Sequence, residues 1–262
     1  ASFVDDSGKA GRVQQYTIDV QKEMKGGVVV SVGYVGSWTS NVTIGGTGST
    51  SVNLNQIQPG TVPLTSALVG NVPNPFFGKA NVAGTLSSGS TVQLGNLLRP
   101  FPQFSSVTMQ RVHQGFARYN SMVVKAEKRS ANGLTVRANW TWSKNLDNVL
   151  GEDNFYVAES SSIQNAYDLS REYSYSTIDT PHRVNITPIY ALPFGKGKPF
   201  MNGGGWTDKA FGGWSLSVVS TFQTGFPLTI SQNTDSTTTF EGSQRPIRIL
   251  GVEPGTPGRI QD

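Results

Sequence analysis

Carboxylates grouped in one stretch are the first residues of this sequence that suggest chemistry. Asp147, Glu152 and Asp153 lie in "LDNVLGEDN", where they could together bind a cation. Their spacing does not match the D-x-[DN]-x-[DN]-G pattern of a calcium-binding loop. The sequence therefore favours a solvated loop over a metal site at this position.

The remaining patterns for catalysis or cofactor binding are incomplete. "PFGKGKP" lacks the earlier glycine and the following Ser or Thr of a phosphate-binding loop, which favours a simple turn. His113 and His182 are far apart in the chain and have no motif around them, and there is no G-x-S-x-G stretch. The absence of cysteine excludes thiol catalysis and disulfides. We therefore expect no enzyme, no metal site and no cofactor.

Composition excludes further classes of protein. Charged residues make up only 15% of the 262 residues, against about 25% in ordinary globular domains. The net charge of +4 is spread along the chain without a basic run, so we expect no nucleic-acid partner. No apolar stretch approaches the roughly 18 residues that a membrane-spanning helix needs.

The elements that must position any site have the pattern of β-strands. In "NGLTVRANWTWSK" the apolar Leu134, Val136, Ala138, Trp140 and Trp142 alternate with polar residues. Successive side chains of a strand point to opposite faces, so this strand has one apolar and one polar face. A proline inside the fifth segment weakens the prediction there. Segments with this alternation are residues 15–21, 27–36, 119–128, 132–144, 182–194 and 213–225.

The short connections predict antiparallel pairs. Residues 15–21 and 27–36 are separated by a hairpin-length turn, as are residues 119–128 and 132–144, where Asn132 and Gly133 favour positive φ. The apolar faces of a pair coincide only if opposed residue numbers are both even or both odd. This condition places Glu127 and Arg137 opposite or diagonal to each other, so the polar face has complementary charges of its own.

The connections alternate between short and very long, with long ones over roughly residues 37–117 and 145–181. Compact soluble domains rarely contain structureless loops of more than about 15 residues. The alternation puts every long loop at one edge of the sheet, as in bacterial outer-membrane barrels. We predict an all-β, antiparallel transmembrane barrel segment of about six to seven strands with long extracellular loops. Its apolar face would meet lipid, with Trp140, Trp142, Tyr190 and Trp214 in the aromatic girdles.

A soluble β-sandwich that binds carbohydrate is the alternative fold, because alternation alone also fits a sandwich. That alternative predicts that Leu134, Val136, Trp140 and Trp142 are buried in a core. The barrel predicts that the same side chains face lipid.

Several stretches, taken in order, resemble the C-terminal barrel of TonB-dependent outer-membrane receptors, specifically the Oar-like group with an N-terminal carboxypeptidase-regulatory-like domain. The resemblance is specific because the stretches occur together and in the order of that family, over roughly residues 12–231. The stretches are "QQYTIDVQKEM", "GYVGS", "VPNPFFG", "LLRPFPQF", "YNSMVVKAEKRSANGLTVRANWTWSKNLDN", "DTPHRVNITPIYALPFGKGK" and "FGGWSLSVVSTFQTGFPLTI".

The resemblance implies a barrel of about 22 strands that is occluded by a plug domain. It also implies import of a scarce ligand with energy delivered by the TonB complex. The sequence shows no signal peptide, regulatory domain, plug or TonB box before residue 12, and it ends in "PGTPGRIQD" rather than in a terminal strand. We therefore expect residues 1–262 to be part of a receptor barrel in the bacterial outer membrane, with the plug and the C-terminal strands absent. The expected partners are membrane lipid and, through the missing plug, the TonB complex.

The long loops and the polar face are where a ligand would bind. Aromatic and arginine side chains are typical recognition anchors, whereas the "RPFPQF" segment is expected to pack as a structural part of its loop. The sequence leaves an oligosaccharide, a peptide and a siderophore open as ligands. It also leaves open an adhesin or a structural surface protein that only displays the loops. The candidate ligand contacts are Trp38, Arg99, Tyr156, Tyr167, Arg171 and Tyr173.

Overall fold

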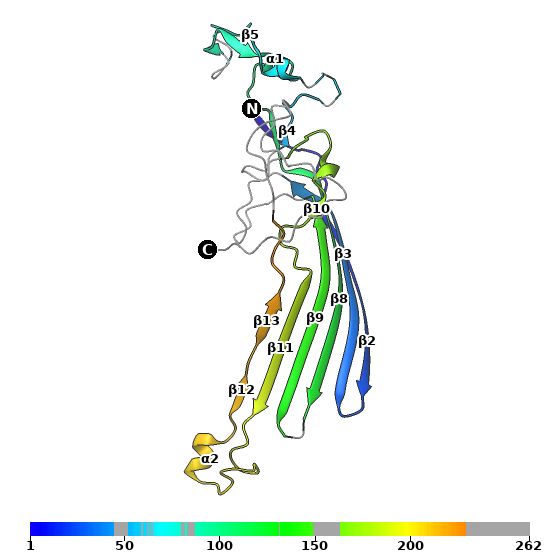
Figure 1. The fold of residues 1–262 in the computed structure, drawn as a ribbon, viewed down its shortest axis with the longest axis vertical. Helices are drawn as coiled ribbons and strands as arrows, with labels where there is room; N and C mark the ends of the chain where they lie inside the picture. Colours follow the sequence, from blue (N-terminus) through cyan, green and yellow to red (C-terminus); the bar gives the residue numbers. More distant parts are fainter. Residues whose placement is uncertain are drawn as a thin grey trace.

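The computed structural model consists of one long antiparallel sheet with a smaller folded region at its upper end (Figure 1). It describes residues 1–44, 52–58, 60–61, 63, 65–79, 82, 87–130, 132–148 and 163–228. Along the sheet the strand order is β2, β3, β8, β9, β11 and β12, with β13 also on β11 and β10 also on β9. These strands are β2 (Arg12–Met24), β3 (Val28–Ile44), β8 (Val112–Arg129), β9 (Leu134–Asp147), β10 (Ser174–Tyr175), β11 (His182–Ala191), β12 (Ser215–Ser217) and β13 (Ser220–Gln223).

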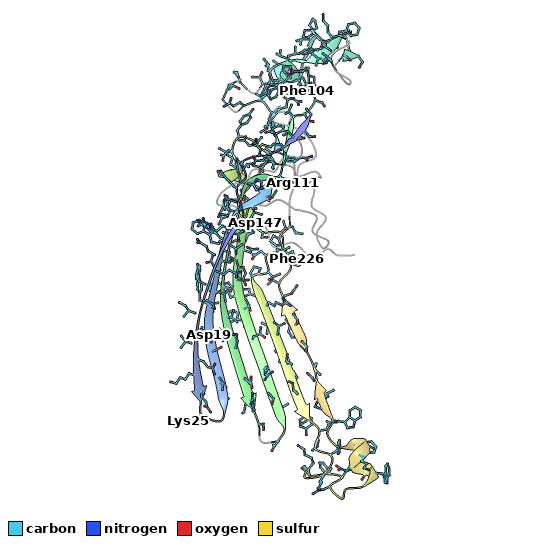
Figure 2. All side chains as sticks on the ribbon, turned by 180° about the vertical axis from the view of Figure 1, so that it is seen from behind. Asp19, Lys25, Phe104, Arg111, Asp147 and Phe226 are labelled. Atoms are coloured by element: carbon cyan, nitrogen blue, oxygen red, sulfur yellow. The ribbon has the colours of Figure 1, made fainter. Side chains whose placement is uncertain are left out.

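Side chains of even-numbered residues share one face of the sheet. In each pair of opposed residues from β2 to β13, the two residue numbers are both even or both odd. This holds below Val42 in β3, where the pairing with β8 is irregular. The even-numbered face is apolar over its middle, and side chains project from both faces in Figure 2. One row of opposed residues crosses the whole sheet without a polar side chain: Val20, Val32, Val124, Trp140, Val184 and Phe222.

The odd-numbered face is polar and carries ion pairs between strands. Glu127 lies opposite Arg137, and its Oε2 is 3.0 Å from the Arg137 Nε, while its Oε1 is 2.7 Å from the Arg129 Nε. Lys125 Nζ lies 3.7 Å from Asp19 Oδ2. The predicted placement of Glu127 and Arg137 is confirmed, and the polar face does compensate its own charges.

The rows between Trp142 and Leu134 cover most of the height of a membrane-spanning band. On β11, His182 lies opposite Trp142 and Tyr190 lies opposite Leu134, eight positions further along. Eight residues of strand cover about 26 Å, and a tilt of about 40° reduces this to a height of roughly 20 Å. Apolar bands of outer-membrane barrels are about 25 Å tall.

Short turns occur at the lower end and long connections at the upper end (Figure 1). Gly26 and Gly27, both with positive φ, close the turn from β2 to β3. The turn from β8 to β9 has the predicted positive φ at Gly133 (82°), but not at Asn132. The turn from β11 to β12 is longer and contains the helix α2 (Trp206–Phe211), in the stretch that includes "PFGKGKP". The predicted asymmetry of the loops is confirmed.

The last predicted strand is interrupted in its middle. Residues 213–225 were expected to form one strand, but β12 and β13 are separated at Val218 and Val219 although both follow β11 in the same register. The gap lies opposite Pro188, which has no N–H to donate to the ladder. The Pro188 carbonyl still accepts a bond from the Val218 N–H at 3.1 Å, so the strand keeps its course.

Within the described residues, no second sheet covers either face of this sheet. Trp140 and Trp142 are 37% and 53% exposed, so the alternative of a soluble β-sandwich with these residues in its core is wrong. Strand β2 is exposed along its whole length, and among the described strands it pairs with β3 alone. Among the described residues, no helix is long and apolar enough to cross a membrane.

The two faces should respond differently to a charge. Val123 and Val124 are neighbours in β8 on the odd-numbered and even-numbered faces, and both are half-buried. We expect Val124→Arg to cost about 2–4 kcal/mol, the penalty of an arginine on the lipid face near the bilayer centre. Val123→Arg should cost much less, because it joins the polar face close to Asp19. Urea titration of the folded fraction, followed by heat-modifiable gel mobility, measures both. Equal losses would contradict the assignment of the faces.

Candidate functional site

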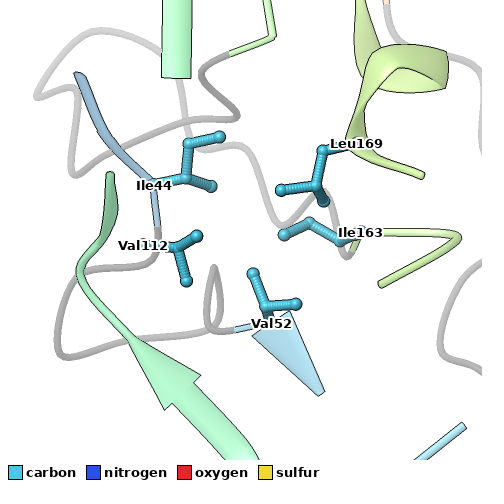
Figure 3. Close-up of a cluster of buried hydrophobic side chains, with 5 residues drawn as sticks. All are labelled: Ile44, Val52, Val112, Ile163 and Leu169. Carbon is cyan, nitrogen blue, oxygen red and sulfur yellow. The ribbon is translucent and has the colours of Figure 1, made fainter. Parts of the chain in front are cut away.

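The two long loops fold together around a small apolar core (Figure 3). Ile44 and Val112 lie at the upper ends of β3 and β8, and Val52 follows in the first loop. Ile163 and Leu169 come from the second loop, and all five side chains are buried. The core therefore joins the loops to each other and to the strand ends, and we call this region the loop module.

The loop module has short elements of its own. Strand β1 (Ser2–Val4) runs parallel to β7 (Thr108–Gln110), which pairs on its other side with β4 (Val52–Asn53). The chain before β2 is thus part of the module. The further elements are η1 (Ser66–Val69), β5 (Asn71–Pro73), β6 (Thr91–Gln93), α1 (Leu94–Leu97) and η3 (Leu169–Glu172).

Arg99 belongs to a segment that one buried amide holds in place. Asn55, with 0% exposure, donates from Nδ2 to the carbonyls of Phe101 (3.1 Å) and Phe104 (2.7 Å) and accepts from the Phe101 N–H (2.9 Å). Arg99 Nη1 donates to the Ser105 carbonyl at 2.9 Å, and burial lowers the pKa of the guanidinium. The expected structural role of "RPFPQF" is confirmed, and Arg99 contributes to it.

Tyr167 links the second loop to the first. Its hydroxyl lies 3.2 Å from the Gln56 carbonyl and 3.4 Å from the Leu54 carbonyl, and can donate to either. The Gln56 side chain in turn accepts from the Ala166 N–H at 2.8 Å. Burial raises the pKa of Tyr167, so the hydroxyl keeps the proton that this contact needs.

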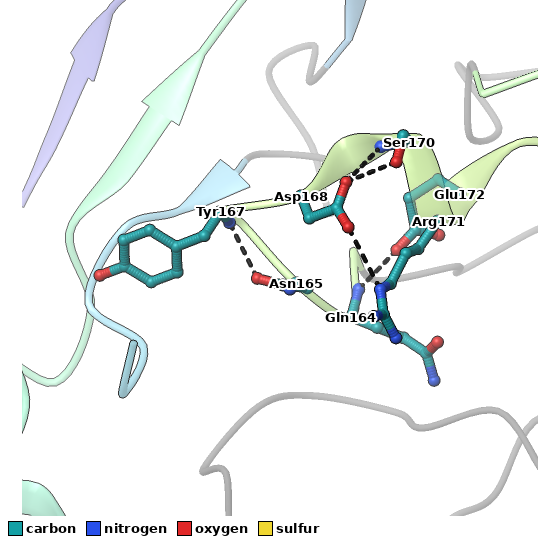
Figure 4. A network of polar contacts seen from close by, with 7 residues as sticks. All are labelled: Gln164, Asn165, Tyr167, Asp168, Ser170, Arg171 and Glu172. Carbon is teal, nitrogen blue, oxygen red and sulfur yellow. Dashed lines mark hydrogen bonds and ion pairs between the residues drawn. The ribbon is translucent and has the colours of Figure 1, made fainter. Parts of the chain in front are cut away.

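A polar network shapes the short helix η3 (Figure 4). Asp168 caps the helix by accepting from the Ser170 N–H (3.2 Å) and hydroxyl (2.5 Å), and it also accepts from Arg171 Nε (3.2 Å). The Ser170 hydroxyl first, and then Arg171, lower the pKa of Asp168. The Tyr173 ring packs 5.0 Å from the ring of Phe116. The Arg171 side chain is 77% exposed and so can reach a ligand.

Trp38 is not a loop residue, so its expected position is wrong. It lies in β3, on the even-numbered face, with the Arg118 guanidinium 5.1 Å from its ring centre. The strand is longer than its alternating apolar pattern and continues above the membrane band. Tyr156, Glu152 and Asp153 lie outside the described residues. Within the described residues, no group of three His, Cys, Asp or Glu side chains could hold a metal ion.

Three of the four aromatic residues expected at the membrane surface lie at the ends of the apolar face, whereas Trp140 lies one row further in, opposite Val124. At the upper end, Trp142 lies opposite His182, and the rings of Trp140 and Trp142 stack with His182 at distances of 5.9 and 6.5 Å. At the lower end, Tyr190 lies next to β12, which Trp214 directly precedes. Contact of these side chains with lipid headgroups remains a prediction.

A sheet with one apolar and one polar face and long loops at one edge defines the wall of a membrane barrel. The chain matches the family described as "Outer membrane beta barrel domain" over residues 1–262, and it belongs to that family. It is therefore a protein of the bacterial outer membrane. Among curated proteins and among solved structures, no significant match is found.

The link through Tyr167 can be tested by removing one oxygen atom. Tyr167→Phe should loosen the second loop, because the net contribution of a hydrogen bond is about 0.5–1.5 kcal/mol. We expect faster hydrogen exchange at the amide of Ala166 than in the unmodified protein. Tyr173→Phe is the matched control, because its ring packing on Phe116 is kept. If the exchange rates after both substitutions were equal, the link would be refuted.

The docking of the N-terminal segment should resist acid. Asp5 accepts from the backbone N–H groups of His113 (3.1 Å) and Ser7 (3.0 Å), and these bonds, His113 first, lower the pKa of Asp5 to about 2. Because this pKa is below its ordinary value of 3.8, the stabilisation is fully present above about pH 4 and is lost as the pH falls through about 2.

We expect the His113 amide to stay protected from hydrogen exchange at pH 4 and to lose protection near pH 2. Asp5→Ala should remove the protection at neutral pH, whereas Asp6→Ala, a change at an exposed neighbour, should not. Loss of protection in the unmodified protein already at pH 4 would contradict this assignment.

Proposed function

We propose that this chain supplies part of the barrel wall and the extracellular loop module of a TonB-dependent receptor of the Oar-like group. Such a receptor captures a ligand with its loops and imports it with energy from the TonB complex. The observation that carries the proposal is the joining of both long loops into one folded module above the wall. The ordered resemblance of the strand segments to that group supports it further.

The polar face fits the wall of a plugged lumen. A hollow of about 350 Å³ on this face is bordered by Gln21, Lys125, Glu127, Arg137 and Asn139, among others. The paired charges there offer hydrogen-bonding groups to a plug or to a passing ligand without a strong net field. The edges at β2 and at β12 with β13 must be paired by further strands, since lipid cannot satisfy them.

The loop module would make the first contact with the ligand, and the chain would take no part in catalysis. Arg171 presents a guanidinium to solvent, and the partly exposed ring of Tyr167 lies in the same loop. An exposed arginine suits a carboxylate-bearing or phosphate-bearing oligosaccharide, peptide or siderophore. These remain the candidate cargoes.

Adhesion is the second candidate function, and one observation favours it. A loop module with its own core displays a fixed surface, which an adhesin needs as much as a transporter does. The two functions differ in energy dependence, because adhesion requires neither a plug nor the TonB complex.

Uptake by cells that carry the full-length protein separates these functions. Labelled oligosaccharides, peptides and siderophores are supplied with and without an uncoupler of the proton-motive force. Energy-dependent accumulation of one of them supports transport, whereas surface binding that the uncoupler does not change supports adhesion.

For a ligand found in this way, we expect Arg171→Ala to weaken binding about tenfold. Such a loss corresponds to one charge-assisted hydrogen bond of roughly 1.5–3 kcal/mol. Lys79→Ala removes an equal charge from an exposed position in the first loop and should leave the affinity unchanged. Equal effects of the two substitutions would show that only the net charge of the loops matters.

A further inference from the structure

We propose that a pocket at the upper end of the lipid-facing surface binds a phosphorylated glycolipid of the outer leaflet. The proposal rests on the membership of the outer-membrane barrel family and not on transport. The pocket has a volume of about 530 Å³. Its walls are formed by β3, β8, β9 and β10 together with the chain between β10 and β11, and include Tyr34, Met122, Trp142, Tyr175 and Asp179.

The pocket exists because the neighbour of β9 leaves the ladder. Strand β11 pairs with β9 as far as His182 opposite Trp142, and β10 resumes pairing at Tyr175 opposite Leu146. The chain between them has more residues than the stretch of β9 that it passes, so it bulges away from the sheet. Separate bonds replace the regular ladder here. Two join backbone groups, from the Ser143 N–H to the Pro181 carbonyl and from the Ser176 N–H to the Asn145 carbonyl, both 2.9 Å long. Two more involve side chains, from the Ser143 hydroxyl to the Thr180 carbonyl (3.1 Å) and from the Asn145 N–H to Asp179 Oδ1 (2.8 Å).

A buried carboxylate in this bulge lacks part of its hydrogen bonding. Asp179 is 2% exposed and its Oδ1 accepts from the Asn145 N–H at 2.8 Å. Its Oδ2 is buried and has no hydrogen-bond partner among the described residues. A buried unsatisfied acceptor is costly, so a donor is expected at this place. A sugar hydroxyl or amide in the pocket supplies one.

The other walls of the pocket fit a sugar. Trp142, Tyr34 and Tyr175 provide aromatic surfaces on which the apolar face of a sugar ring packs. The Tyr34 hydroxyl donates to Asn120 Oδ1 at 2.7 Å, which leaves the Asn120 amide nitrogen to donate to a ligand. The pocket thus combines aromatic surfaces with an acceptor and a donor.

Charge on this surface selects an anionic lipid. All carboxylates in the described strands of the large sheet, namely Asp19, Glu23, Glu127 and Asp147, lie on the odd-numbered face. In these strands the even-numbered face carries cations and no carboxylate, so that Asp179 of the bulge is the acidic group that lines the pocket. Two of the cations, Lys144 and Arg118, lie beside the pocket or one row above it. Each cation is held above an aromatic ring, Lys144 at 4.9 Å from Tyr175 and Arg118 at 5.1 Å from Trp38.

The surface below the pocket continues as an apolar face. Met122 lines the pocket, and Val124 and Trp140 follow towards the centre of the membrane band. This surface thus has three parts: the cations, the pocket and the apolar face below it. A phosphorylated glycolipid matches all three, with its phosphate at Lys144 and Arg118, its sugar against Asp179 and its acyl chains over the valines. A soluble sugar or a free phosphate would use only one of them.

The test measures lipid retained by the purified full-length protein in detergent, using native mass spectrometry. The probe is an acylated glucosamine disaccharide with two phosphates, offered beside the same lipid without phosphates, phosphatidylglycerol and inorganic phosphate. We expect retention of the phosphorylated glycolipid alone, with a loss of about tenfold after Lys144→Ala combined with Arg118→Ala. Lys128→Ala, which removes a cation from the opposite end of the same face, should change nothing.

Asp179→Asn should lower retention of the phosphorylated glycolipid while the heat-modifiable mobility of the barrel is kept. If this variant does not fold, the Lys144 and Arg118 variants still decide the question. Equal retention of phosphatidylglycerol or of the dephosphorylated lipid would overturn the proposal, as would an equal effect of Lys128→Ala.

Discussion

Lipid offers no hydrogen bonds to a polypeptide backbone, and most of this structure follows from that condition. Within the membrane band every strand must pair on both sides, and the described strands of that band form one continuous antiparallel sheet. The sheet separates two media, and its residues alternate accordingly. Carboxylates are confined to one face, while the opposite face carries an apolar row across all the strands.

Above the membrane band water can form hydrogen bonds with the backbone, and the regular sheet gives way to loops and short elements. Strands β3 and β8 continue upwards, but their alternation is lost and their ends turn inward to a core. Water can satisfy the backbone there, so short parallel and antiparallel pairs, 3-10 turns and capping side chains replace the long ladders. The backbone of the loops forms hydrogen bonds with single side chains, such as those of Asn55, Tyr167 and Asp168, where the sheet uses bonds between neighbouring strands.

Sequence alone predicts the part of the fold that lipid constrains. The six segments, the two pairs joined by short turns and the contact of Glu127 with Arg137 follow from alternation and turn length. The interruption of the last segment at Val218 and Val219 does not. The upper limits of β3 and β8 do not, because residues 37–44 and 112–118 lack a regular apolar pattern, and Trp38 was assigned to a loop for that reason. The core of the loop module joins residues that are more than 100 positions apart, such as Ile44 and Leu169. In the sequence, the residues of this core appear only as isolated apolar residues within polar loops, which do not predict that they pack together.

The shared core of the loop module has a consequence for how such surfaces diversify. Ile44 and Val112 come from the ends of β3 and β8, Val52 from the first loop, and Ile163 and Leu169 from the second, so neither loop can change the volume of its core residues alone. A larger side chain in one loop requires a smaller one in the other. Substitutions at exposed positions such as Arg171 need no compensating change of volume elsewhere. Among related chains, substitutions in the core of the loop module should therefore occur in correlated pairs, whereas substitutions at its exposed positions should occur independently. The ligand-binding surface can then change while the fold of the module stays the same.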